Sequence, residues 1–338
     1  MTASATDLIG RWFLARRRQG VDDTMYFAVV DASGAVLDWQ GYPHASHDGL
    51  GALTLMLEQQ GCTFRPPRHG RALAPPSLWS LLKGRPWRHQ PAINAPQWLR
   101  PPAATGNRRC GAEAIQVFRF SQARTRALEQ RARELQVSLT ALVLAAQHRV
   151  ISAALCQPGT GGGWFVPVDL RASISLPRFT MNHCSGVFLD LPAAASPAHV
   201  HRQVRERLRA GLHWWYWLQA RLVARLGQWC VNVLYGRLAR PGRYLGSFSM
   251  LGHWQVDWRG SGFPADAALA CCGPGSPTYP VANGVMVTNG ALTLALKADP
   301  SLGLSDSQVA ALMHDWVGEL MAQADAASAE LAGQEQVA

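Results

Sequence analysis

Residues 43–49 read Pro-His-Ala-Ser-His-Asp-Gly, and they are the most informative stretch of the chain. Two β-rich runs precede it, Tyr26–Val30 and Val36–Trp39, with an Asp-Ala-Ser-Gly turn of hairpin type between them. An apolar helical periodicity begins directly after the stretch and predicts a helix that starts near Asp48. We therefore expect His44 to lie in a turn between a strand and a helix.

His44 is the candidate catalytic residue. An imidazole with an ordinary pKa of about 6.5 can take a proton from an alcohol or an amine near neutral pH. The competing interpretation is an ordinary loop histidine. His47 is read as a bystander, and the two histidines do not predict a metal site because no third ligand follows nearby. We expect a general base and no bound metal.

The stretch resembles the HHxxxDG signature of the chloramphenicol-acetyltransferase-like superfamily. This group includes the condensation domains of peptide synthetases, the wax ester synthases and the polyketide-associated acyltransferases. The second histidine of the signature falls on His44, the aspartate on Asp48 and the glycine on Gly49, whereas Pro43 stands where the first histidine would be. The resemblance implies that His44 activates the acceptor as a base and that Asp48 has a structural role.

Later segments extend the resemblance, in the same order and with similar spacing, from about residue 26 to the C-terminus. Residues 166–171 are similar to the strand of the superfamily that ends in an arginine. The resemblance implies that this arginine, Arg171, pairs with Asp48 and ties the motif to the second half of the chain. A buried carboxylate without a partner would be costly, which is the physical reason for such a pair.

Three more segments support the same resemblance. The loop after that strand contains Asn182 and is followed by residues 189–192, which match many wax ester synthases. Residues 247–252 look like the strand beside the active-site tunnel, and residues 285–292 resemble the last hairpin of the sheet. We take Asn182 and Ser249 as candidates for contact with the oxyanion or the tunnel.

Residues 198–240 predict the longest helical tract, which is first rich in arginine and then in tryptophan. Trp214, Trp215 and Trp217 are candidates for lining a tunnel for a lipophilic acyl chain, and the alternatives are core packing or an interfacial belt. Arginines recur in the tract at steps of three and four and predict a basic stripe, either solvated or anion-binding. Contact with the inner face of a membrane is a further alternative.

The other elements are predicted from periodicity and from turn residues. The expected helices cover residues 7–18, 77–82, 121–135, 137–155, 198–240 and 305–322. The further expected strands cover residues 114–120, 164–168, 186–191, 244–250, 285–287 and 292–296. Residues 65–107 are rich in proline, arginine and tryptophan and predict a long, largely irregular excursion.

Composition and charge limit the class of protein. Of the 338 residues, 48% are apolar and 16% are charged, which indicates a globular chain. The net charge of +10 is carried almost wholly by arginine and would attract anions. Nucleic acid, anionic lipid, the phosphates of coenzyme A and an acidic carrier protein all qualify by charge. Nucleic acid is not expected, because no recognised nucleic-acid motif is present.

Compartment and redox state follow from two simple patterns. Residues 16–18 are arginines that come after the apolar residues of the N-terminal segment, the reverse of a secretory signal, and they predict a cytoplasmic protein. Seven cysteines without CxxC spacing predict reduced, mostly buried thiols. The sequence shows no internal repeat, and no apolar run is long enough to cross a bilayer.

The glycine run at 159–163 has no phosphate-loop pattern and is the expected linker between two lobes. Residues 1–158 would form the lobe that carries the motif, and residues 159–338 the C-terminal lobe. The expected fold class is two-lobed α/β, with mixed sheets packed with helices and an active-site channel between the lobes. Members of the superfamily carry a longer segment before the motif. The first lobe is thus expected to be trimmed, or completed by residues 65–107 or by another chain.

These expectations combine into one predicted activity. The chain would move a hydrophobic acyl group from an acyl-CoA or a phosphopantetheinyl carrier-protein thioester to a small alcohol or amine. The setting would be lipid or natural-product biosynthesis, and no cofactor would be bound permanently. The alternative is a catalytically inactive docking module for a carrier protein, which Pro43 and the short segment before the motif favour.

Overall fold

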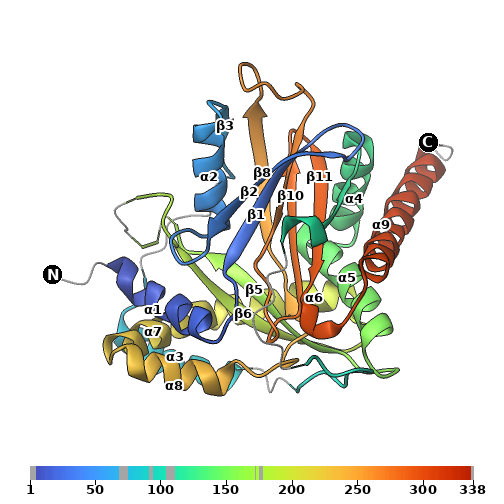
Figure 1. Cartoon of the computed structure of the whole chain (residues 1–338). Coiled ribbons are helices and arrows are strands. Elements are labelled where there is room, and N and C mark those ends of the chain that lie inside the picture. The colour runs from blue at the N-terminus through green and yellow to red at the C-terminus, as the bar shows by residue number, and fades with distance from the viewer. Residues whose placement is uncertain are drawn as a thin grey trace.

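A computed structural model describes residues 5–67, 75–90, 94–103, 111–171, 173–174 and 178–335 (Figure 1). Its helices are α1 (Ala5–Arg18), α2 (Gly49–Gln59), α3 (Leu78–Gly84), α4 (Gln122–Glu134), α5 (Leu139–Leu155), α6 (Pro197–Arg209), α7 (Leu212–Arg225), α8 (Gln228–Leu238) and α9 (Asp306–Glu335). Short 3-10 helices are η1 (Pro86–His89), η2 (Ala112–Ala114) and η3 (Pro300–Leu302). Parts of the predicted excursion at 65–107, namely 68–74, 91–93 and 104–107, lie outside the described residues.

The strands form two sheets in the described part of the chain. They are β1 (Thr24–Val30), β2 (Val36–Pro43), β3 (Thr63–Arg65), β4 (Gln116–Arg119), β5 (Gly162–Asp169), β6 (Cys184–Leu191), β7 (Gly246–Ser247), β8 (Met250–Asp257), β9 (Ala268–Cys272), β10 (Val281–Thr288) and β11 (Ala291–Ala298). The small sheet has the order β2-β1-β9. The large sheet runs β3-β8-β10-β7-β5-β6, and β11 joins β10 to β4. It is mixed, because β10 is parallel to β7 and β8 but antiparallel to β11.

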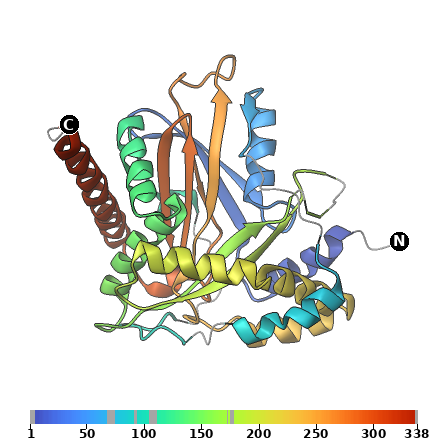
Figure 2. The same cartoon turned by 180° about the vertical axis from the view of Figure 1, so that it is seen from behind.

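Helices cover the sheets on different sides. Figures 1 and 2 show α4, α5 and α9 together on one side of the large sheet, and α1, α3, α7 and α8 gathered at one end of the molecule. The largest apolar cluster joins α5 and α9 to this sheet, and Trp164 and Trp316 are fully buried in it. A second cluster lies between α2, β1 and β8, around Leu53 and Trp254. The predicted α/β class with mixed, helix-packed sheets is confirmed.

Strands from both sides of the predicted lobe boundary share one sheet. The register of β1 with β9 runs from Tyr26 opposite Cys272 to Val30 opposite Ala268. The first strand is thus completed by residues that come about 240 positions later. The assignment of residues 1–158 and 159–338 to two lobes stays a prediction.

The glycine run at 159–163 is not the linker that we expected. Its last two residues belong to β5 and are buried. A Cβ atom on Gly161 would lie 1.9 Å from the carbonyl oxygen of Leu191, and one on Gly162 would lie 2.7 Å from Pro96 Cγ. The glycines are needed because neighbouring chain segments pack directly against this backbone.

Most of the other predicted elements are confirmed to within a few residues, with three differences. The predicted tract 198–240 is three helices, broken where Gly211 and Gly227 adopt φ of 73° and 110°. The strand expected at 244–250 is wrong, since only Gly246–Ser247 and Met250 within it are in strands. The last helix continues to Glu335, beyond the predicted end at residue 322.

Among the described helices, none is both long and apolar enough to cross a membrane by itself. Helices α4 and α5 meet the length and composition criteria only as a pair, with a bend of 98° between them.

His148 gives the fold a built-in sensitivity to acid. Its Nδ1 accepts a hydrogen bond from Trp164 Nε1 at 3.0 Å, and its Nε2 donates to the carbonyl of Pro192 at 2.8 Å. A neutral imidazole, with its proton on Nε2, therefore makes both hydrogen bonds. Burial lowers the pKa of His148 to about 4. As pH falls from 6.5 towards 4, the unfolded chain takes up a proton that the native chain does not, so stability falls.

We expect the free energy of unfolding to drop by about 3 kcal/mol between pH 7 and pH 4 through His148 alone. Urea unfolding at the two pH values measures this drop, and His148→Gln should flatten it. His314→Gln, at an exposed histidine, is the matched control and should leave the pH dependence unchanged. Equal pH dependence in the His148 variant and in the parent protein would contradict the assignment.

Candidate active site

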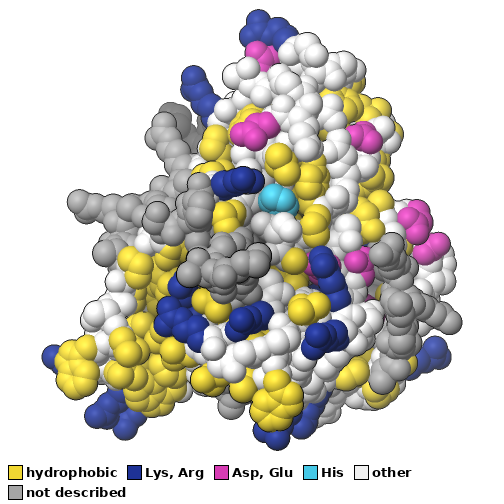
Figure 3. Space-filling model, turned by 60° about the vertical axis from the view of Figure 1, so that its left-hand side comes forward, with side chains coloured by type: hydrophobic (Ala, Val, Ile, Leu, Met, Phe, Trp, Pro, Cys, Tyr) yellow, Lys and Arg dark blue, Asp and Glu magenta, His cyan; other side chains and the backbone are white. Residues whose placement is uncertain are grey.

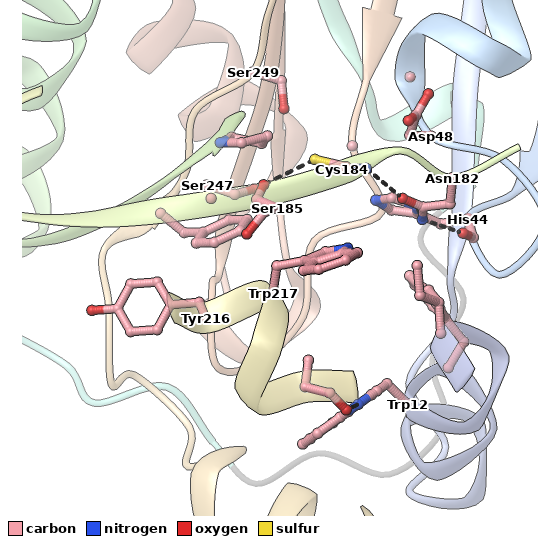
Figure 4. A pocket seen from close by; sticks show the side chains of 18 of the residues that line it. Trp12, His44, Asp48, Asn182, Cys184, Ser185, Tyr216, Trp217, Ser247 and Ser249 are labelled. Atoms are coloured by element: carbon pink, nitrogen blue, oxygen red, sulfur yellow. Dashed lines mark hydrogen bonds between the residues drawn. The ribbon is translucent and has the colours of Figure 1, made fainter. Parts of the chain in front are cut away.

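A cavity of about 960 Å³ lies where the turn after β2 meets α1, α7 and the edges of β5, β6 and β8 (Figure 4). His44 and Asp48 from the motif line it, together with Asn182 and Ser249 from the second half of the chain. The structure therefore brings the motif residues and the two oxyanion or tunnel candidates to one cavity. Most of the remaining wall is apolar.

Local hydrogen bonds fix the position of His44. Its backbone N–H donates to the carbonyl of Asp23 at 2.9 Å, which holds the turn against the start of β1. The carbonyl of Pro43 accepts from the N–H groups of Ser46 and His47 and closes the turn. Pro43, which replaces the first histidine of the signature, thus ends β2 and leaves His44 in place. The ring of Phe13 lies 4.9 Å from the His44 ring, centroid to centroid.

The surroundings of the His44 ring decide which nitrogen carries the proton. Nδ1 lies 3.0 Å from the carbonyl oxygen of His47, and a carbonyl can only accept, so Nδ1 is protonated in the neutral ring. Asn182 Nδ2 lies 3.2 Å from both Nδ1 and the carbonyl oxygen of His44. We assign its N–H to the carbonyl, because the shorter contact of Nδ1 with His47 requires a proton on Nδ1, and Asn182 Oδ1 accepts from Cys184 N. Among the described residues, Nε2 of His44 has no hydrogen-bond partner. This nitrogen is left with a free lone pair.

The environment keeps His44 neutral. Burial is the largest cause that lowers its pKa below 6.5, and the positive charge of Arg16 acts in the same direction. The charge of Asp48 and backbone hydrogen bonds oppose this shift but do not cancel it. The imidazole is therefore mostly in the form that can accept a proton at neutral pH.

The predicted pair between Asp48 and Arg171 is confirmed. Arg171 donates from Nη1 to Asp48 Oδ2 at 2.8 Å and from Nη2 to Asp48 Oδ1 at 2.6 Å, with both side chains buried. The same carboxylate accepts from His183 N at 2.7 Å and caps α2 by accepting from Gly51 N at 2.9 Å. One carboxylate thus joins the motif, α2 and the loop before β6.

Arg171 has partners on every side of its guanidinium. It also donates to Asp169 Oδ1 at 2.9 Å and to the carbonyls of Phe179 and Met181. Burial acts to lower the pKa of Arg171, but the hydrogen bond and charge of Asp48, with the charge of Asp169, outweigh it and raise that pKa. The cation is therefore permanent, and its role is to hold the motif.

The tryptophans predicted from the helical tract divide into two groups. Trp215 and Trp217 line the cavity, and the guanidinium of Arg221 stacks 4.5 Å from the Trp217 ring centre. Trp214 does not line it. It is buried against Leu81 and belongs to the core between α3 and α7. The difference arises because adjacent helical residues point about 100° apart.

Sequence reasoning missed the contribution of α1 to the wall. Trp12, Phe13 and Arg16 line the cavity, and Trp12 Nε1 donates to the carbonyl of Ala220 on α7 at 3.0 Å. Arg16 donates to the carbonyls of Asp22 and Gly275. The apolar residues of the predicted helix 7–18 were the available signal, but they did not reveal what that helix would cover.

The backbone of Ser249 is held by two hydrogen bonds. Its N–H donates to Asn283 Oδ1 at 3.1 Å, and its carbonyl accepts from Val285 N at 2.8 Å. Within the described residues, no group of three or more His, Cys, Asp or Glu side chains could hold a metal ion.

Loss of either member of the buried pair should destabilise the protein. Asp48→Ala and Arg171→Ala are each expected to lower the free energy of unfolding by about 3–5 kcal/mol, because each leaves a buried charge without its main partner. The double variant should lose less than the sum of the two. Urea denaturation measures all three. Asp257→Ala is the matched control, since Asp257 pairs with Arg259 at the exposed surface and should have little effect. Normal stability and full activity in either buried variant would show that the pair does not hold the motif.

Comparison with known proteins places the fold. No family model matches the chain, and no curated protein sequence matches it. Solved structures do. The epimerization domain from the third module of tyrocidine synthetase B matches with a TM-score of 0.51 and 14% identity, over 86% of this chain and 69% of that chain. A four-domain nonribosomal peptide synthetase bound to AMP and glycine matches with a TM-score of 0.51 and 16% identity, over 84% of this chain and 23% of that chain.

The condensation domain of the monacolin K polyketide synthase has a TM-score of 0.49 and 14% identity, over 84% of this chain and 68% of that chain. Identities of this size inform on the fold. The likeness to the first two structures agrees with the mixed, helix-packed sheets described above. The fold of this chain is therefore similar to that of a peptide-synthetase epimerization domain and of a four-domain nonribosomal peptide synthetase.

Proposed function

We propose that this chain is a condensation-type acyltransferase, in which Nε2 of His44 accepts the proton of an alcohol or amine as that group attacks an acyl thioester. The supporting observation is the free Nε2 of a neutral imidazole at the wall of an apolar cavity. The resemblance of residues 43–49 to the superfamily signature, on a fold shared with peptide-synthetase structures, makes acyl transfer the first reaction class to test. A general base of this kind contributes about 10²–10⁴-fold to the rate.

The steps balance without a metal or another cofactor. The acceptor O–H or N–H gives its proton to Nε2, and its lone pair forms a bond to the thioester carbon. The carbonyl electrons move to oxygen and give a tetrahedral oxyanion. As the oxyanion collapses, the C–S bond breaks. The leaving thiolate then receives the proton from the imidazolium and departs as a thiol. Ser249 and Asn182 are the candidate contacts for the oxyanion or the tunnel.

The cavity wall favours a hydrophobic acyl group. Trp12, Trp215 and Trp217 supply large apolar faces, and the cavity is wide enough for a chain of many carbons. The donor would be an acyl-CoA or an acyl group on an acidic phosphopantetheinyl carrier protein, since the net charge of +10 suits either. A cytoplasmic site of action and a place in lipid or natural-product biosynthesis remain part of this proposal.

Replacing His44 tests the proposal directly. His44→Ala should reduce acyl transfer by about 10²–10⁴-fold, because no other described side chain occupies the position of Nε2. Thiol release from acyl-CoA and acyl-pantetheine thioesters, measured with a panel of alcohols and amines, gives the rate. The matched control is His47→Ala. That ring lies three residues away, contacts the carbonyl of Thr180 and does not line the cavity.

Thiol release that persists in His44→Ala would remove His44 from the mechanism. Thiol release in neither the parent protein nor the variant would favour the docking module, the alternative suggested by the Pro43 substitution.

The pH dependence supplies a second test. The pKa of His44 is lowered by burial, so the protonated, inactive form accumulates only below pH 6.5. We expect kcat/KM to stay constant above pH 6.5 and to fall through a midpoint below it. Because the charge of Arg16 helps to lower this pKa, Arg16→Gln should move the midpoint upwards. A pH–rate profile of both proteins measures the shift. A midpoint above 6.5 in the parent protein would contradict the assignment of His44 as the base.

A further inference from the structure

Two long segments of the sequence contain basic residues but neither aspartate nor glutamate: residues 59–112 and residues 207–256. The described parts of these segments include α3 and η1 from the first and α7 and α8 from the second. Figures 1 and 2 show these helices together at one end of the molecule. The fold has therefore collected two acid-free segments, far apart in the sequence, at one surface.

This surface also exposes large apolar side chains. Trp79 on α3 is 77% exposed, Trp229 on α8 is 75% exposed and Leu226, between α7 and α8, is 73% exposed. We call it the basic apolar face, and define it by Leu78, Trp79, Leu222, Leu226, Trp229, Val233 and Leu238 with the exposed Lys83, Arg225 and Arg237.

Charge and apolar surface are interleaved there. Trp229, Val233 and Arg237 are four residues apart and share one side of α8. In Figure 3, yellow and dark blue side chains mix over the lower part of the molecule, and the magenta side chains lie higher.

A lipid bilayer is the partner that this combination fits best. Exposed tryptophan and leucine beside arginine and lysine are the pattern of surfaces that lie in the headgroup region. Acidic residues would be repelled by anionic lipid, and the two segments that build the face have none. A patch with several large apolar residues exposed is also unusual on a surface that meets only water.

The face is continuous with the candidate active site. Leu222 and Leu238 line the cavity and are also exposed, at 47% and 43%. They therefore form an apolar route between the cavity and the surface of α7 and α8. An acyl chain that moved from a bilayer into the cavity along this route would stay in contact with apolar side chains. Binding of an acidic protein partner would not require such an apolar route.

We infer that the basic apolar face rests on an anionic lipid bilayer and that the cavity opens towards that bilayer. The surface contact is independent of the reaction. The clause that a lipid-borne substrate enters the cavity rests on the proposed function.

Vesicle co-sedimentation tests the contact, with phosphatidylcholine alone and with added phosphatidylglycerol. The chain should bind the anionic vesicles more tightly, and salt should weaken the binding. Arg225→Gln with Arg237→Gln should lower the partition coefficient by about fivefold for each arginine removed. Arg126→Gln is the matched control, because Arg126 is exposed on α4, away from the face. Leu226→Asp with Trp229→Asp should lower it by about tenfold or more, whereas Leu37→Asp, at an exposed leucine of β2, should not.

Three outcomes would overturn the inference. They are equal binding to both kinds of vesicle, no binding to either, and unchanged binding of the Leu226/Trp229 double variant. The rival occupant is an acidic protein. If purified holo acyl carrier protein binds the same residues while vesicles do not, the face is a protein interface and the inference is wrong.

Thiol release from water-soluble thioesters separates this inference from the proposed function. Leu226 and Trp229 do not line the cavity, so their double variant should keep the parent rate. If the parent protein does not bind vesicles but does transfer acyl groups, only the surface contact is wrong. If the parent protein binds vesicles but does not transfer acyl groups, only the proposed function is wrong.

Discussion

The buried pair of Asp48 and Arg171 is the interaction on which the site depends. These residues are 123 positions apart, and each would be costly to bury alone. Together they satisfy one another, and the carboxylate also caps α2 and accepts the N–H of His183. The pair therefore fixes the start of a helix, the loop before β6 and the turn that carries His44 at a single point.

The loop before β6 acts on both ends of the motif. Asn182 donates to the carbonyl of His44, and its neighbour His183 donates its N–H to Asp48. Since consecutive residues hold His44 and Asp48, a shift of this loop would move both. Among the described residues, the His44 ring is oriented by the backbone carbonyl of His47 and lies beside the Asn182 amide, and no carboxylate is bonded to it. This leaves the ring neutral, in agreement with its lowered pKa.

Local pattern predicted much of this arrangement. The hairpin before the motif, the helix that starts near Asp48 and the helix predicted at 121–135 are confirmed, because turn residues and the caps Asp48 and Ser121 act over a few positions. The partner of Asp48 came from resemblance to a family, since no local pattern joins residues 123 apart.

Tertiary contacts decided what the sequence did not predict. Strand β9, Ala-Leu-Ala-Cys-Cys, is short and buried on both faces, so it lacks the alternation that marks a half-exposed strand. The glycine run was predicted to be a linker, yet Gly161 packs directly against the backbone of Leu191. The wall formed by α1 and the separation of Trp214 from its neighbours depend on how helices pack, which periodicity alone does not give.

The pairing of β1 with β9 also has a consequence for the order in which the molecule is made. A ribosome completes residues 24–30 long before it reaches 268–272, so the nascent chain carries one strand edge without its partner through most of translation. Phe27 and Val29, buried in the finished protein, would remain accessible to chaperones during that time. The turn that carries His44 is held to Asp23, just before the same strand, so it reaches its final surroundings only after residues 268–272 have been made.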